Sequence, residues 1–174
     1  MEPLKLVALD IEDLDVLSAN LQDAVLTVGD MAYLARQNRF AAICNRFDWQ
    51  SALATVADGR RRGPYRRRRS ALRFERVRAA KLQNIDPAAK DQVLELLAIQ
   101  FEATRNGGGD EGGAGPEGDI SLIFAGGGVV RLHVECIEAE LRDLGPVWST
   151  RSRPQHGDDG PIETTPPPES DQGN

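Results

Sequence analysis

The densest group of chemically active side chains in this sequence is a run of arginines in its middle third. Guanidinium groups bind phosphates and carboxylates through paired hydrogen bonds, and an aromatic ring beside them can stack on a base. The run therefore predicts an anion-binding loop. An arginine run is a weak motif by itself, so an alternative stays open. In that alternative the run is a solvated loop that pairs loosely with acidic segments. The residues are Arg60, Arg61, Arg62, Tyr65, Arg66, Arg67, Arg68 and Arg69.

A second candidate site is the segment from Asn45 to Trp49. In an extended strand Asn45, Phe47 and Trp49 share one face, and Arg46 and Asp48 share the other. As a site, Trp49 would anchor a partner, with Asn45 as its polar neighbour. As structure, the aromatic residues belong to the core and Arg46 pairs with Asp48 on the surface. Aromatic residues two apart are usually core residues, which favours the structural interpretation.

Three weaker patterns predict no catalytic residue, no metal site and no cofactor. The glycines 126–128 are followed by a strand, whereas a phosphate-binding loop needs a helix there, so they indicate a hairpin turn. His133 and Cys136 are three residues apart, but zinc needs about four ligands. Cys44 and Cys136 lie in predicted core elements, and no serine lies in a strand-turn-helix elbow.

Hydrophobic periodicity places these residues on a series of short elements. A strand at 4–9 leads into a helix at 11–24, where Asp10 caps by accepting from the amide of Asp13 or its neighbour. In the strand predicted at 70–80, the apolar residues lie on one face only if there is a bulge near Glu75 and Arg76. In the strand predicted at 93–103, the part before Leu97 could instead be helical. Further strands are expected at 31–36, 40–49, 93–103, 120–124 and 130–134, with a second helix from about 135 to 144.

These elements predict an α+β fold. No helix separates the later strands, so an antiparallel sheet or partly closed barrel of about seven strands is favoured over a parallel sheet. Seven strands and a C-terminal capping helix resemble the pleckstrin-homology-like barrel, although the helix after the first strand departs from that plan. We expect one domain over 1–154 with exposed loops at 57–69 and 106–118, and a disordered, acidic, proline-rich tail over 155–174.

The charge of this 174-residue chain is unevenly distributed along it. The total is −6, but residues 1–35 carry −6, residues 36–90 carry +11, and residues 91–174 carry −11. No apolar run approaches the roughly 20 residues of a membrane-spanning helix, and the first ten residues do not resemble a secretory signal. With two cysteines that do not form a dense disulfide framework, the composition indicates a cytoplasmic protein with reduced thiols and no membrane association.

Several longer motifs resemble those of a bacterial family of small proteins, a domain of unknown function. The resemblance covers roughly residues 4–153 and implies no activity and no functional residues. The motifs are Asn45-Arg46-Phe47-Asp48-Trp49, Arg68-Arg69-Ser70-Ala71-Leu72, Phe124-Ala125-Gly126-Gly127-Gly128, Arg131-Leu132-His133-Val134-Glu135-Cys136-Ile137-Glu138-Ala139 and Leu144-Gly145-Pro146-Val147-Trp148.

Three functions stay open from the sequence. Charge segregation and the lack of a catalytic set favour a non-enzymatic binding or adaptor domain for a macromolecular partner, most simply a protein. The first alternative is RNA binding through the arginine run and Tyr65, against which the total charge argues. The second is an enzyme whose active-site residues are spread over several strands. We also expect the acidic tail to fold back on the arginine run and screen it.

Overall fold

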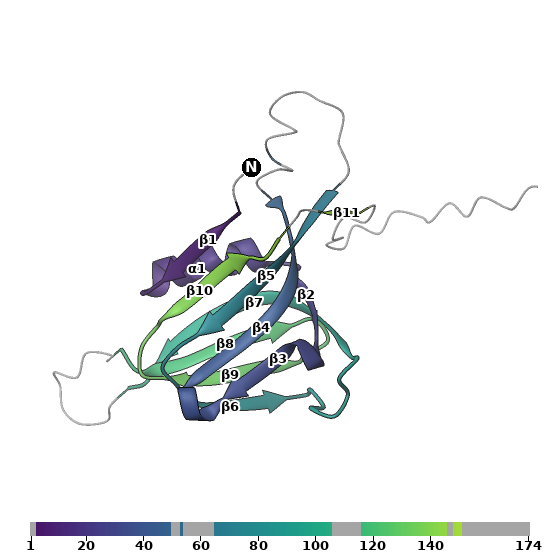
Figure 1. Cartoon of the computed structure of the whole chain (residues 1–174). Coiled ribbons are helices and arrows are strands. Elements are labelled where there is room, and N and C mark those ends of the chain that lie inside the picture. The colour runs from purple at the N-terminus through teal and green to yellow at the C-terminus, as the bar shows by residue number, and fades with distance from the viewer. Residues whose placement is uncertain (1–2, 50–52, 54–64, 106–115, 146–147, 151–174) are drawn as a thin grey trace, which may run out of the picture.

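The computed structural model describes residues 3–49, 53, 65–105, 116–145 and 148–150. Within these residues the chain forms the α-helix α1, two short 3₁₀-helices and eleven strands that belong to a single sheet (Figure 1). The elements are β1 (Lys5–Ala8), α1 (Ile11–Leu21), β2 (Val25–Thr27), η1 (Val28–Asp30), β3 (Met31–Leu34), η2 (Ala35–Gln37), β4 (Arg39–Phe47), β5 (Tyr65–Phe74), β6 (Val77–Gln83), β7 (Val93–Ala103), β8 (Gly118–Phe124), β9 (Val129–Val134), β10 (Ala139–Asp143) and β11 (Trp148–Thr150).

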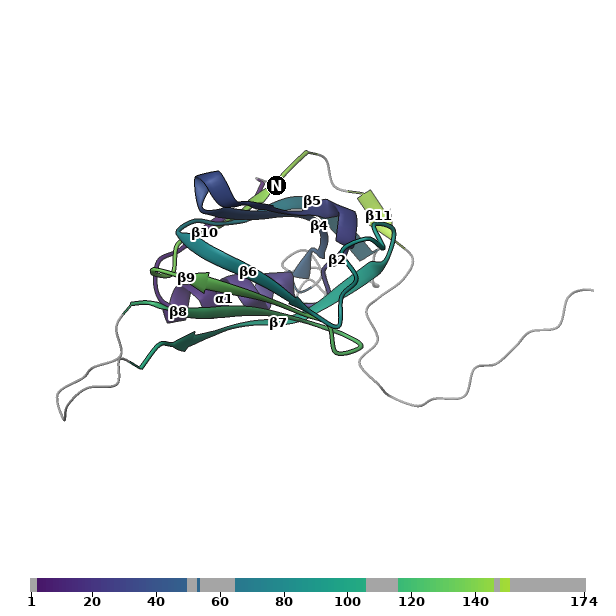
Figure 2. The same ribbon diagram turned by 90° about the horizontal axis from the view of Figure 1, so that it is seen from below.

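Every strand pairing in the sheet is antiparallel, as the sequence predicts. The strand order is β1-β10-β5-β4-β2-β7-β8-β9-β6, with β3 paired to β4 and β11 paired to β5. The sheet bends over, so that β4 and β5 lie on one side of the core and β7 and β8 on the other (Figure 2). The path is open, and eleven strands replace the expected seven. The expected partly closed barrel is therefore wrong in strand number and closure.

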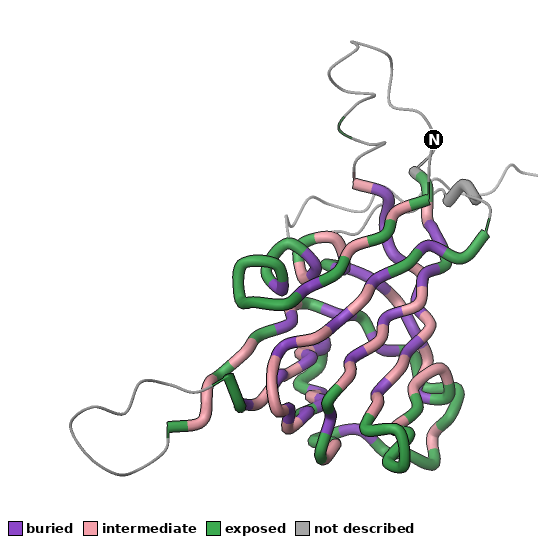
Figure 3. The backbone as a smooth tube through the Cα atoms, turned by 60° about the vertical axis from the view of Figure 1, so that its left-hand side comes forward, coloured by how far each residue is buried: buried purple, intermediate pink, exposed green. Residues whose placement is uncertain are grey.

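The core lies inside this bend and is built from alternate residues of the strands. Buried and more exposed positions succeed one another along the backbone (Figure 3). On β5 and β10 the inward positions include Leu72, Phe74, Ala139 and Leu141, each at most 2 % exposed. Period-two alternation of this kind is the signature of strands with one face on the core.

The helix α1 forms where the sequence predicts one and covers the interior between β1 and β7. Its inward face presents Leu14, Leu17 and Leu21, all buried. The side chain of Asp10 accepts a hydrogen bond from the backbone N–H of Asp13 at 2.8 Å, which confirms the expected cap. The helix ends three residues earlier than the prediction.

Two turns, one of them the predicted turn at glycines 126–128, contain residues with left-handed backbone conformation. Asn38, between β3 and β4, has a φ of 50°, a left-handed value that asparagine tolerates better than most residues. Gly126 and Gly127, between β8 and β9, have φ values of 84° and 88°. The glycines therefore form a hairpin turn and not a phosphate-binding loop.

The predicted single strand over 70–80 is in fact two strands in different parts of the sheet. Arg76 has a φ of 60°, which breaks the extended chain between β5 and β6. The backbone N–H of Glu75 then bonds to the carbonyl of Glu138, and that of Val77 to the carbonyl of Asn38. The chain turns a corner at Glu75-Arg76, where we had expected a bulge.

The predicted C-terminal helix is wrong, because residues 139–143 form β10 between β1 and β5. The apolar spacing of Ile137, Leu141 and Leu144 imitates a helix. The inward positions are Ala139, Leu141 and Asp143. A buried carboxylate at a core position hid the period-two pattern.

The expected loops and tail are tested only in part. Residues 65–69 belong to β5, so the predicted loop over 57–69 is wrong there, and residues 57–64 lie outside the described residues. Residues 106–115 and the tail over 155–174 also lie outside them, so the single domain over 1–154 stays a prediction. In the described part of the chain, no helix is long and apolar enough to cross a membrane.

Candidate binding surface

The predicted arginine cluster is divided between the two faces of the sheet because most of it lies on strand β5. Alternation sends Arg68 inward, where it is 4 % exposed, and leaves Arg66 and Arg69 exposed and Arg67 half-buried. Tyr65 is the first residue of this strand. Arg60, Arg61 and Arg62 lie outside the described residues. The arginines therefore do not form one anion-binding loop.

On the inner face, Arg68 joins a buried polar cluster, which comprises Arg46, Asp48, Arg68, Ser70 and Asp143. Arg46 donates to both carboxylate oxygens of Asp143 at 2.8 Å, a bidentate pair. Arg68 donates from Nε to Asp48 at 2.9 Å. The Ser70 hydroxyl donates to Asp143 at 2.7 Å. The predicted surface pair of Arg46 with Asp48 is therefore wrong, since both residues are buried and each pairs with another residue.

Asp143 is the centre of the buried polar cluster. Burial alone raises the pKa of a carboxyl group, but the hydrogen bonds from Arg46, Ser70 and the Leu4 amide outweigh it here. The pKa of Asp143 consequently lies below its ordinary value, and the carboxylate stays ionised. Because the donors come from β4, β5 and the start of the chain, Asp143 fixes β10 in register between β5 and β1.

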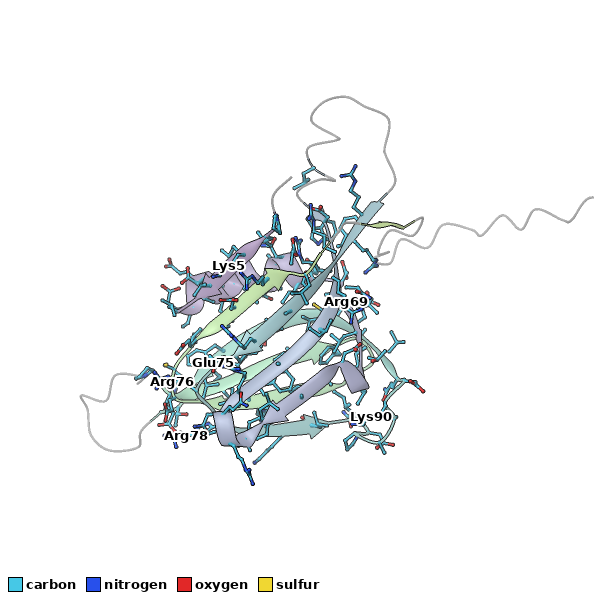
Figure 4. All side chains as sticks on the ribbon, in the orientation of Figure 1. Lys5, Arg69, Glu75, Arg76, Arg78 and Lys90 are labelled. Carbon is cyan, nitrogen blue, oxygen red and sulfur yellow. The ribbon has the colours of Figure 1, made fainter. Side chains whose placement is uncertain are left out.

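On the opposite, outer face of the same strands lies a second group, which we call the basic face: Lys5, Asn45, Arg69 and Arg142. Lys5 on β1 stands directly opposite Arg142 on β10, and Arg69 on β5 stands opposite Asn45 on β4. The register pairs Arg142 with Ala71, so Arg69 and Arg142 are diagonal neighbours, with Cα atoms about 7–8 Å apart. Figure 4 labels Lys5 and Arg69 on this side of the sheet.

The two arginines of the basic face carry exposed guanidinium groups. Among the described residues, neither Arg69 nor Arg142 forms an ion pair, and both are exposed. Lys5 contacts Glu140 at 3.7 Å with 55 % of its side chain exposed, a loose pair. The backbone beneath is held by the buried polar cluster, because Arg69 lies between Arg68 and Ser70 and Arg142 precedes Asp143. The two guanidinium groups thus project from a fixed backbone.

The cations at the opposite corner of the sheet are neutralised. Arg73 contacts Glu75 at 3.1 Å and Glu140 at 3.5 Å, and Arg39 contacts Glu75 at 2.7 Å. Arg76 pairs with Glu138 and Arg78 with Glu135. Figure 4 shows Glu75, Arg76 and Arg78 together at this corner, away from Arg69.

The other predicted site residues lie beside the basic face. Trp49 packs edge-on against Phe47, with ring centroids 4.4 Å apart, and its indole N–H donates to the carbonyl of Gln22. Phe47 is buried, as the structural interpretation predicts, whereas Trp49 is half-buried. Arg67 reaches across β4 and donates to the carbonyls of Asp23 and Asn45. These contacts link Trp49 and Arg67 to the backbone between α1 and β2.

Outside the basic face, the His133 ring lies between two carboxylates. Its Nδ1 lies 2.9 Å from Asp119 and its Nε2 lies 2.8 Å from Glu117. These hydrogen bonds raise the pKa of His133. Burial raises the pKa of Cys44 to about 12, so this thiol is not a nucleophile near neutral pH. In the ranges that the structure describes, no group of three or more His, Cys, Asp and Glu side chains could hold a metal ion.

Of the four residues of the basic face, the sequence predicts Asn45 and Arg69 as candidate site residues but does not indicate Lys5 or Arg142. The sequence pattern places Arg142 on a helix, and a helix there does not predict a position next to β5. The signal that could have found it is the alternation in Ala139 to Asp143, with Asp143 treated as a possible core residue. Lys5 follows once β1 is known to pair with β10, a contact that joins residues more than 130 positions apart.

These observations define an open antiparallel sheet with one helix and a basic patch on its outer face. The chain belongs to a family described as a protein of unknown function (DUF2948), whose model matches residues 4–156. This confirms the resemblance to a domain of unknown function. Comparisons with curated proteins and with solved structures gave no match.

Proposed function

We propose that this chain is a non-enzymatic binding domain that uses the basic face to hold an acidic segment of a partner protein. The observation that carries the proposal is the pair of exposed guanidinium groups of Arg69 and Arg142, on neighbouring strands and without carboxylate partners among the described residues. A guanidinium group binds a carboxylate through two parallel hydrogen bonds.

The spacing of the two arginines suits an extended peptide. Alternate residues of an extended chain lie about 6.5 Å apart on one side, and diagonal neighbours in an antiparallel sheet lie about 7–8 Å apart. Acidic residues at positions i and i+2 of such a peptide can therefore meet Arg69 and Arg142 together. The carboxamide of Asn45 and the ammonium of Lys5 add donors at the two sides.

An acidic peptide fits this face better than RNA. Proteins that hold single-stranded RNA combine cations with aromatic rings on which the bases stack. The side chains between the cations here are Ala71, Ile43 and Asn45, which provide no ring. The chain's charge of −6 also disfavours a long polyanion and tolerates a short acidic segment.

The proposal is tested by fluorescence-anisotropy binding of a labelled twelve-residue peptide of alternating Glu and Ser at low salt. Changing Arg69→Gln and Arg142→Gln together is expected to weaken binding about tenfold or more. The matched control is Lys81→Gln with Arg131→Gln, which removes two exposed cations that face each other on β6 and β9.

Equal loss in the two double variants would overturn the proposal, since binding would then follow net charge alone. A twelve-residue oligo(U) is titrated in parallel. If the RNA binds, the peptide does not, and R69Q/R142Q abolishes the RNA binding, the partner class is nucleic acid and the proposal of a protein partner fails.

A further inference from the structure

A segment of this chain carries the chemistry that the basic face would bind. Residues 155–174 contain no Lys or Arg and five acidic residues, which are Asp158, Asp159, Glu163, Glu169 and Asp171. These residues lie outside the described part of the chain. That they can reach the basic face therefore follows from their sequence and from the position of the strand to which they are attached.

The attachment point lies close to the basic face. β11 pairs with β5 so that Trp148 stands opposite Arg67 and Thr150 opposite Tyr65. Tyr65 and Arg69 are four residues apart on one strand, a distance of about 13 Å. The 19 residues from 151 to 169 can span up to about 60 Å. The acidic residues can therefore reach Arg69 and Arg142 easily.

Two of the acidic residues have the spacing that the basic face requires. Glu169 and Asp171 are separated by one residue, so in an extended chain their carboxylates lie on one side about 6.5 Å apart. Asp158 and Asp159 are adjacent and point to opposite sides when extended.

We propose that Glu169 and Asp171 occupy the basic face in the absence of a partner, where their carboxylates pair with the guanidinium groups of Arg69 and Arg142. The proposal rests on the proposed function, because the tail then acts as an internal competitor that an incoming acidic segment must displace. Tethering through a linker of this length gives an effective concentration on the order of millimolar. Only partners with several acidic residues at alternate positions displace it.

The experiment uses the full-length chain and the same Glu-Ser peptide. E169Q/D171N is expected to bind the peptide about five- to tenfold more tightly than the native chain at low salt, because the competitor is weakened. D158N/D159N removes the same charge without the alternate spacing and is expected to change affinity less than twofold. Unchanged affinity in E169Q/D171N, or an equal gain in both variants, would overturn the proposal.

A second measurement separates this proposal from the proposed function. The side-chain Nε–Hε signals of Arg69 and Arg142 are compared by NMR in the native chain and in E169Q/D171N, without added peptide. We expect both signals to shift and that of Arg131 to stay in place. If the peptide binds neither protein but these signals shift, the tail contact stands and the external partner fails. If they do not shift, the tail contact fails whatever the peptide does.

Discussion

Strand β5 carries two arginines that make nearly the same ion pair in opposite surroundings. Arg68 lies 2.9 Å from Asp48 with its side chain 4 % exposed, and Arg73 lies 3.1 Å from Glu75 with its side chain 42 % exposed. The inner pair has no access to water, so removing one partner leaves a buried charge. The outer pair exchanges its contacts for water at little cost. Distance alone therefore does not reveal what an ion pair contributes.

The largest expected effect is the difference between two matched substitutions on this strand. Arg68→Met should lower the free energy of unfolding by about 3–5 kcal/mol, because Asp48 loses this buried partner. Arg73→Met should lower it by less than about 1 kcal/mol. Urea unfolding followed by tryptophan fluorescence measures both. If R68M does not fold, Arg68→Lys keeps the charge and should fold with reduced stability. Equal losses in R68M and R73M would contradict the comparison.

A smaller effect is expected at the serine that completes the buried polar cluster. Ser70→Ala removes the hydroxyl that donates to the Asp143 carboxylate at 2.7 Å. A hydrogen bond to a charged group contributes about 1.5–3 kcal/mol, so S70A should lose that much stability. Ser121→Ala on β8, at a half-buried position, is the control and should change little. A loss below 0.5 kcal/mol in S70A would show that Asp143 does not need this donor.

His133 gives a smaller, pH-dependent effect at the surface. Its pKa is raised in the folded protein by the hydrogen bonds to Asp119 and Glu117. The resulting stability is fully present below the unfolded pKa of about 6.5 and is lost as the pH rises through the folded value. Stability should therefore fall slightly between pH 6 and 8.5 at low salt, and less at high salt.

The charged groups around this histidine define the control. Asp119 also stands opposite Glu102 on β7. Arg131 on β9 is a diagonal neighbour of Asp119. His133→Gln should remove the fall in stability above pH 6, whereas the native chain keeps it. An identical pH profile for the two proteins would assign the dependence to another group.

The smallest effect on stability is expected on the basic face. Lys5→Gln breaks the contact of Lys5 with Glu140, whose atoms are 3.7 Å apart at an exposed position. The free energy of unfolding should change by less than about 0.5 kcal/mol. The same variant should weaken binding of the Glu-Ser peptide, measured by anisotropy. A stability loss above 1 kcal/mol would show that this face is structural and not available for a partner.

The elements that the sequence predicts correctly are those whose signals are local. The cap at Asp10, the apolar face of Leu14 and Leu17, and the glycines of the β8–β9 turn each depend on residues close together in the chain. Local side-chain chemistry determines such elements, and neighbouring residues in the sequence are enough to identify them.

Two of the errors, the loop predicted over 65–69 and the helix predicted over 135–144, have one physical origin, which is the buried polar cluster. Arg68 and Asp143 occupy core positions, and their burial depends on partners 20 and 97 residues away in the chain. A hydropathy pattern treats them as surface residues, so it predicts a loop over residues 65–69 of β5 and a helix over β10. The basic face is hidden from the sequence for the same reason, because Arg142 lies near Arg69 only when residues 139–143 are known to form β10 beside β5.

The position of β10 between β1 and β5 sets the order of events during synthesis. Its residues 139–143 fill the gap in the sheet, so β1 and β5 have no lasting partner on that side until the chain has grown by about 65 residues beyond Phe74. At about 5–20 residues per second, the edge of β5 stays unpaired for roughly 3–13 seconds. The arginines at 66–69 lie on that edge. Their mutual repulsion opposes pairing of two such edges from neighbouring nascent chains.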